Sequence, residues 1–188
     1  MSAKHYFPEA AANKLVPRAL RALVVSTPHL ALDEPDRVVA NAYHDPSTVS
    51  VIGGGGSGHE PAWSGYVGHG LLSAAACGDI FASPSAMQVM KAIRMAPSSR
   101  GIILLITNYT GDRLHFGLAA EKARSDGLVE NIAVLPATDD VSIGRSGSSR
   151  LGRRGLAGHV IGRYRFPRPS RYFGYAGALV HGTWTRVD

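Results

Sequence analysis

Cysteine and long apolar runs are almost missing from this sequence. Cys77 is the only cysteine among the 188 residues, so no internal disulfide can form. The longest apolar run, Ile102 to Ile106, has strand length and falls far short of the roughly 18 residues of a membrane span. The N-terminal stretch "MSAKHYFPEAAANK" lacks the apolar core of a signal peptide. These absences predict a cytoplasmic protein with no membrane partner.

Acidic residues are scarce in the last quarter of the chain. Residues 141–188 hold nine arginines, no lysine and one acid, so they carry a formal charge of +8, whereas residues 1–140 carry −2. A nucleic-acid-binding domain would place basic residues on a folded face. This charge lies instead in a segment rich in Arg, Gly, Pro and Tyr, without regular hydrophobic periodicity. We therefore expect a solvated tail and no nucleic-acid partner.

Strand and helix patterns alternate along the rest of the chain. Apolar and β-branched runs predict strands at 47–52, 79–82, 101–107 and 131–136. Helical spacing predicts helices at 8–26, 83–96 and 113–127. Pro17 is expected to kink the first helix, and Ser83 to cap the second. Residues 61–79 contain too many glycines for a good helix. The alternation predicts an α/β fold, a parallel-rich sheet with crossover helices.

Two loops follow predicted strands of this sheet. Residues 53–61 read "GGGGSGHEP" and follow the first strand, and residues 108–112 read "NYTGD" and follow a later one. Ligands bind at the carboxyl ends of strands in such sheets. We therefore expect both loops to contribute to one site.

The glycine loop does not fit a nucleotide site well. Gly53, Gly55 and Gly58 match G-x-G-x-x-G, with Asp79 at a suitable distance, but consecutive glycines satisfy many patterns. A P-loop would need Lys and Ser or Thr where His59 and Glu60 follow Gly58. The remaining interpretation is that the glycine backbone closely approaches a small polar ligand. His59 would then transfer protons, and Asp112 would act as a base or hydrogen-bond acceptor. The structural alternative is that His59 and Asp112 merely cap helices. No cluster of His, Cys and Asp has metal-ligand spacing, so we expect no metal site.

Four longer motifs resemble the dihydroxyacetone (glycerone) kinase family. They read "GGGSGHEP", "SGYVGHGLLSAAACGDIFASPS", "NYTGDRLHFGLAAEKAR" and "GRRGLAGHV", and they span much of residues 7–158. The resemblance implies that residues 1–158 form the N-terminal half of the family's substrate-binding domain, an incomplete one. Residues 159–188 would be a basic tail, disordered or foreign to the family.

The resemblance also implies roles for individual residues. In that family a histidine nitrogen adds to the carbonyl of dihydroxyacetone or another short ketone or aldehyde, and a free hydroxyl of the tethered substrate then attacks ATP. His59 would be the hydrogen-bonding or acid–base histidine, and Asp112 would accept the proton of the attacking hydroxyl. The remaining substrate-binding residues would be Gly56, Ser57, Gly58, Ser83 and Thr107.

The sequence departs from the family pattern in three ways. Thr107 stands where the family commonly has lysine, the resemblance ends before the covalent histidine, and nothing corresponds to the domain that binds ATP and Mg²⁺. We therefore expect a truncated, marginally stable chain that binds neither ATP nor Mg²⁺ and is inactive alone. The alternative is a catalytically dead truncated paralogue that binds a small ketone or serves a regulatory role. If the chain folds, the resemblance implies a homodimer.

Overall fold

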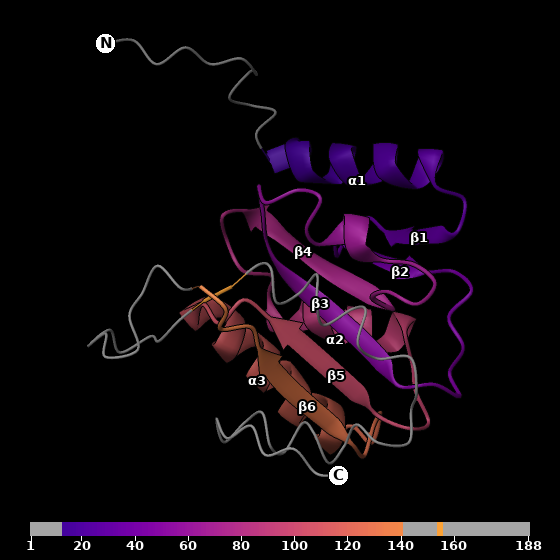
Figure 1. Ribbon diagram of the computed structural model, residues 1–188, viewed down its shortest axis with the longest axis vertical. Coiled ribbons are helices and arrows are strands. Elements are labelled where there is room, and N and C mark those ends of the chain that lie inside the picture. Colours follow the sequence, from indigo (N-terminus) through magenta and orange to yellow (C-terminus); the bar gives the residue numbers. More distant parts are fainter. Residues whose placement is uncertain (1–12, 141–153, 156–188) are drawn as a thin grey trace.

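A computed structural model describes residues 13–140 and 154–155 and contains a six-stranded sheet flanked by helices (Figure 1). The strands are β1 (Leu30–Asp33), β2 (Val38–Asn41), β3 (Ser50–Ser57), β4 (Ala74–Ile80), β5 (Ile102–Ile106) and β6 (Ile132–Pro136). The helices are α1 (Leu15–Ser26), α2 (Ala86–Met95), α3 (Thr110–Ser125) and a short 3-10 turn, η2 (Ser64–Tyr66). No helix in these ranges is long and apolar enough to cross a membrane.

The sheet order is β1-β2-β4-β3-β5-β6, and the last four strands run parallel. Helix α2 connects β4 to β5, and α3 connects β5 to β6, as expected for crossover connections. The α/β prediction, with a parallel-rich sheet, is therefore confirmed. The antiparallel β1 and β2 were not predicted, because each has four residues and a short strand leaves little periodicity to detect.

The two faces of the sheet bury separate cores. On one face α2 and α3 pack against alternate residues of the strands, with Phe116, Ile52 and Leu104 fully buried. On the other face α1 and the segment after β3 supply Leu20, Trp63 and Leu72. Figure 1 shows α1 beside the β1 end of the sheet and α2 and α3 together behind it. A strand buried on both faces reads as a continuous apolar run, which is why β5 was predictable.

Three local predictions are wrong. Pro17 does not kink α1, because it lies in the first turn, where a proline removes no helical hydrogen bond. The glycines do not end the strand: β3 continues through Gly53, Gly54, Gly55 and Gly56 to Ser57. Most of β4 was missed, because its buried "AAAC" run combines weak strand formers with no alternation of polar and apolar residues.

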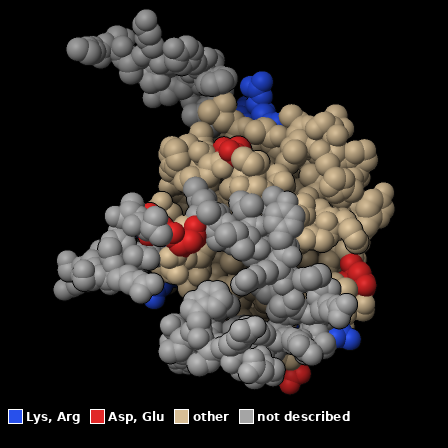
Figure 2. Space-filling model, in the orientation of Figure 1, with Lys and Arg blue, Asp and Glu red and all other residues tan. Residues whose placement is uncertain are grey.

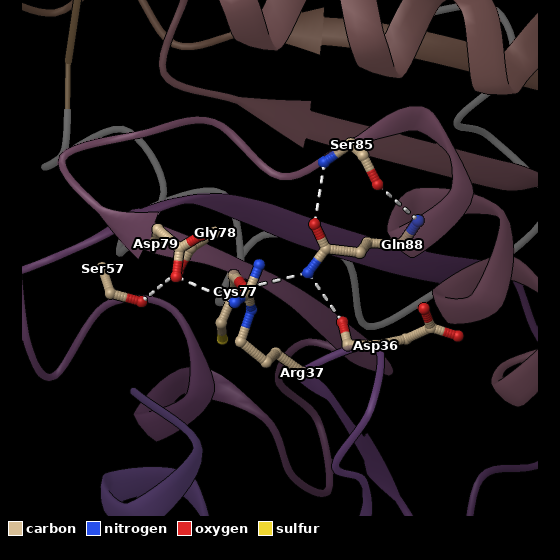
Figure 3. Close-up of polar contacts among 8 residues, drawn as sticks. All are labelled: Asp36, Arg37, Ser57, Cys77, Gly78, Asp79, Ser85 and Gln88. Atoms are coloured by element: carbon tan, nitrogen blue, oxygen red, sulfur yellow. Dashed lines mark hydrogen bonds and ion pairs between the residues drawn. The ribbon is translucent and has the colours of Figure 1, made fainter. Parts of the chain in front are cut away.

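Helix α2 is capped by Ser85 and not by Ser83. The Ser85 hydroxyl accepts a hydrogen bond from the Gln88 N–H, and the Gln88 side chain accepts one from the Ser85 N–H, which is a capping box. The Gln88 amide then donates to the carbonyls of Asp36 and Cys77, at 2.8 and 3.3 Å (Figure 3). This network ties the loop after β4 to the sheet and leaves the Ser83 hydroxyl available elsewhere.

The predicted boundary at residue 158 and the predicted tail at 159–188 lie outside the described residues. On the face shown in Figure 2, the described surface is mostly uncharged, and its acidic and basic side chains are scattered.

The packing around β3 predicts that Gly54 tolerates no side chain. A Cβ there would collide with the backbone oxygen of Ala76 and lie 2.9 Å from the Phe116 ring. We expect Gly54→Ala to lower the free energy of unfolding by about 1–3 kcal/mol in denaturant titration, the usual cost of overpacking. Gly117→Ala in α3 is the control: its Cβ meets nothing within 4 Å, so it should stabilise the helix by about 0.5–1 kcal/mol. Equal stability of the two variants would contradict this account.

Burial raises the pKa of the Cys77 thiol to about 12. Since the thiolate is the reactive form, Cys77 should stay neutral and unmodified by iodoacetamide at pH 8 in the native chain. Its labelling rate should rise sharply in denaturant, where the pKa returns to its ordinary value. Mass spectrometry measures the labelling. Rapid labelling of the native chain at pH 8 would show that the thiol of Cys77 is accessible, and would contradict this prediction.

Candidate functional site

A cavity of about 430 Å³ lies where β3, β4 and β5 end. It is lined by Gly56, His59, Trp63, Phe81, Ser83, Thr107, Tyr109, Thr110, Gly111, Asp112 and Arg154. The two loops that were expected to contribute to one site therefore meet at this cavity. The cavity is large enough for a small polyhydroxy compound.

Asp112 is the buried charge of this cavity, with 1% of its surface exposed. It lies in the first turn of α3, where the helix dipole favours a negative charge. Ser83, in the loop before α2, donates to Oδ1 at 2.5 Å, and Thr107, directly after β5, donates to Oδ2. These two hydroxyls partly offset the cost of burying the carboxylate and fix its orientation. Asp112 can therefore act as a hydrogen-bond or proton acceptor in a fixed orientation.

His59 is oriented by the backbone of β3. Its Nδ1 lies 3.1 Å from the carbonyl oxygen of Gly56. A carbonyl oxygen can only accept, so Nδ1 carries the proton and Nε2 of the neutral ring keeps a lone pair. Trp63 Nε1 donates to the same carbonyl at 3.2 Å. His59 can therefore accept or transfer a proton at Nε2.

Phe81 packs against His59 from the loop after β4. The two rings meet edge to face, with centroids 5.3 Å apart. Phe81 has a φ of 53°, and Asn108, beside Thr107, has a φ of 69°. Left-handed backbone is costly for residues other than glycine and gathers at functional sites. Phe81 lines this cavity, and Asn108 lies between two residues that line it, Thr107 and Tyr109.

Five of the seven sequence-predicted residues line the cavity: Gly56, His59, Ser83, Thr107 and Asp112. Ser57 and Gly58 instead line a neighbouring, mostly apolar cavity of about 400 Å³ beside α1. The Ser57 hydroxyl donates to the Gly78 carbonyl at 2.7 Å, as Figure 3 shows, and the Gly58 N–H donates to the Glu60 carboxylate. In this structure Ser57 ties the end of β3 to β4, and Gly58 takes part in a local turn with Glu60.

Six lining residues were not predicted: Trp63, Phe81, Tyr109, Thr110, Gly111 and Arg154. All six fall within or beside the motifs that carry the family resemblance, yet membership of a motif gives no sign that a residue faces a cavity. Asp112 was predicted to follow a strand but lies within α3, which begins at Thr110, three residues before the predicted start.

Among the described residues, no group of three or more His, Cys, Asp or Glu side chains could hold a metal ion. The cavity combines a fixed carboxylate, an imidazole with a free lone pair and a close backbone approach at Gly56. This set suits binding a small hydroxylated molecule and removing a proton from one of its hydroxyls.

Comparison with known proteins gives a consistent picture. A family model described as the Dak1 domain matches residues 21–163. A dihydroxyacetone kinase of Komagataella pastoris is 48% identical over 84% of this chain and 25% of its own length. The dihydroxyacetone-binding subunit of a dihydroxyacetone kinase of Listeria innocua is 46% identical over 68% of this chain and 38% of its own length.

A solved structure shares the fold. The dihydroxyacetone kinase of C. freundii, in complex with AMP-PNP and Mg²⁺, matches with a TM-score of 0.76 and 34% identity over 96% of this chain and 34% of that one. The chain thus spans only about a quarter to two fifths of the length of these relatives. With the family model matching most of its residues, and with the expected fold and motifs in place, the chain belongs to the dihydroxyacetone kinase family.

Proposed function

We propose that the cavity binds dihydroxyacetone or a similar short ketone, as the substrate-binding part of a glycerone kinase. The observation that carries the proposal is the fixed carboxylate of Asp112, held by Ser83 and Thr107 in the cavity that His59 also lines. The family membership and the names of the relatives support it.

Each residue has a defined task in this proposal. Asp112 accepts the proton of the substrate hydroxyl that becomes phosphorylated, and Ser83 and Thr107 hold the carboxylate in place for that transfer. His59 bonds to a substrate oxygen through Nε2. Gly56 lines the cavity and contacts the ligand through its backbone.

ATP and Mg²⁺ belong to the full reaction of the family, in which they supply the phosphoryl group and neutralise its charge. Among the described residues, no group of three or more His, Cys, Asp or Glu side chains could hold a metal ion by itself. In this proposal ATP and Mg²⁺ are bound by another domain or subunit, as the family resemblance implies. A cytoplasmic location, which the sequence predicts, and a homodimer, which the resemblance implies, are part of the same proposal.

The affinity for ketone tests the site. We expect His59→Ala and Asp112→Ala each to weaken dihydroxyacetone binding by at least about tenfold in isothermal titration, since each removes a polar contact to the ligand. His69→Ala is a matched control, because His69 is exposed and does not line the cavity. Unchanged affinity in both site variants, with wild-type affinity in the control, would rule out this site.

A second candidate function is ketone binding without phosphoryl transfer. The Listeria relative favours it, because there the dihydroxyacetone-binding subunit is a separate chain. A coupled assay for ADP release separates the candidates. We expect no turnover by the purified chain alone with ATP, Mg²⁺ and dihydroxyacetone.

Addition of an ATP-binding subunit or domain from a relative is the discriminating arm of this assay. Turnover restored by that addition supports the kinase function, whereas ketone binding with no turnover under both conditions supports the binding function. Turnover by the chain alone would overturn the assignment of ATP to another domain.

A further inference from the structure

Arg154 is the only lysine or arginine among the described residues that line the cavity. Its guanidinium carbon lies 4.3 Å from the centroid of the Tyr109 ring, in a cation–π arrangement. Stacking on a ring covers one flat face of the guanidinium and leaves its N–H groups at the edge. Arginine stays charged at any physiological pH, so this position adds a permanent positive charge to the cavity wall.

The backbone of Arg154 is held in place next to β6. The Asp140 N–H donates to the Arg154 carbonyl at 2.7 Å. The next residue, Gly155, lies so close to Asp139 that a Cβ would overlap its side chain. Arg154 therefore reaches the cavity from a fixed point far away in the sequence from Asp112.

The described residues give the Arg154 guanidinium no ion-pair partner. Its Nε is buried and has no hydrogen-bond partner among these residues. The Asp112 carboxylate is occupied by two hydroxyls. Asp139 and Asp140 line a smaller cavity that Arg154 also borders. A guanidinium with no ion-pair partner among the described residues is suited to an acceptor group of a ligand.

A neutral ketone has no charge for a cation to neutralise, whereas its phosphorylated form carries negative charge that a cation stabilises. Phosphorylation of a hydroxyl beside Asp112 would leave a phosphate monoester with nearly two negative charges in a cavity that already holds a buried carboxylate. A stacked guanidinium offers paired N–H donors that match phosphate oxygens. Tyr109 and Thr107 border both cavities that Arg154 lines, so the charge lies within reach of the Asp112 region.

We propose that Arg154, held on the Tyr109 ring, binds the phosphate group of a phosphorylated short ketose in this cavity. The inference rests on the proposed function, because it takes the ketose from there and adds the recognition of its phosphate. Arg154 would thus distinguish product from substrate, while His59 and Asp112 contact the part that both share.

Titration of the full chain with three probes tests the proposal: dihydroxyacetone phosphate, dihydroxyacetone and inorganic phosphate. We expect Arg154→Gln to weaken binding of dihydroxyacetone phosphate by about tenfold or more, and to leave dihydroxyacetone binding and the melting temperature unchanged. Inorganic phosphate should bind more weakly and show the same dependence on Arg154. Arg154→Lys keeps the positive charge but loses the paired N–H donors of the guanidinium, so it should lose less affinity than Arg154→Gln.

Two further variants define the mechanism. Arg113→Gln is the matched control, since Arg113 is exposed on α3 and does not line the cavity, and it should bind every probe like the wild type. Tyr109→Leu keeps Arg154 but removes the ring, and should weaken binding of the phosphorylated probe only.

The outcomes separate this inference from the proposed function. Wild-type affinity of Arg154→Gln for dihydroxyacetone phosphate overturns the phosphate assignment, and so does equal loss of both ketose probes. Glycerate, a three-carbon carboxylate, binding as tightly as the phosphate ester would also overturn it. Failure of the wild-type chain to bind dihydroxyacetone counts against the proposed function instead.

Discussion

The rest of the structure depends on the four consecutive glycines of β3, because they leave no side chains between the layers that pack on this strand. A Cβ at Gly55 would lie 2.8 Å from the Trp63 indole, and one at Gly54 would collide with β4 and approach Phe116. Trp63 belongs to one core and Phe116 to the other, so the glycines let both layers close on the central strand. At Gly56 the same lack of a side chain brings the loop after β4 against the strand end. Glycine is a poor strand former, and these positions require it because of packing on both sides.

The cavity forms because the glycines of β3 allow neighbouring segments to pack close to this strand. Trp63 and His59 share the Gly56 carbonyl as acceptor, and Phe81 reaches His59 from the neighbouring loop. The capping box of α2 sets where that loop returns, and so places Ser83 beside Asp112. The geometry of the cavity therefore also depends on contacts outside its lining, because the cap of α2 lies two residues from Ser83, which lines the cavity.

The strands and helices with strong patterns were predictable, and the site was predictable in part. β5 is a continuous apolar run and α3 has clear helical spacing, so both appeared close to where they lie. β4 was missed because alanines and a cysteine give no period, and β1 and β2 because they are too short. The meeting of His59 with Asp112 followed from topology alone, since parallel strands end at one edge. The sequence could not predict that Ser57 does not line the cavity, because its side chain is held by a hydrogen bond to Gly78, a residue distant in the sequence.

The cavity wall is assembled from segments that the sequence keeps apart: the end of β3, the loop before α2, the start of α3, and Arg154. None of these segments surrounds a ligand by itself, so an unfolded chain offers no equivalent site. A ligand that contacts all of them works as a reversible crosslink between parts of the sheet. Such a ligand raises the free energy of unfolding with the logarithm of its concentration once that concentration exceeds Kd. Ligand binding at this cavity and folding of the chain are therefore linked equilibria.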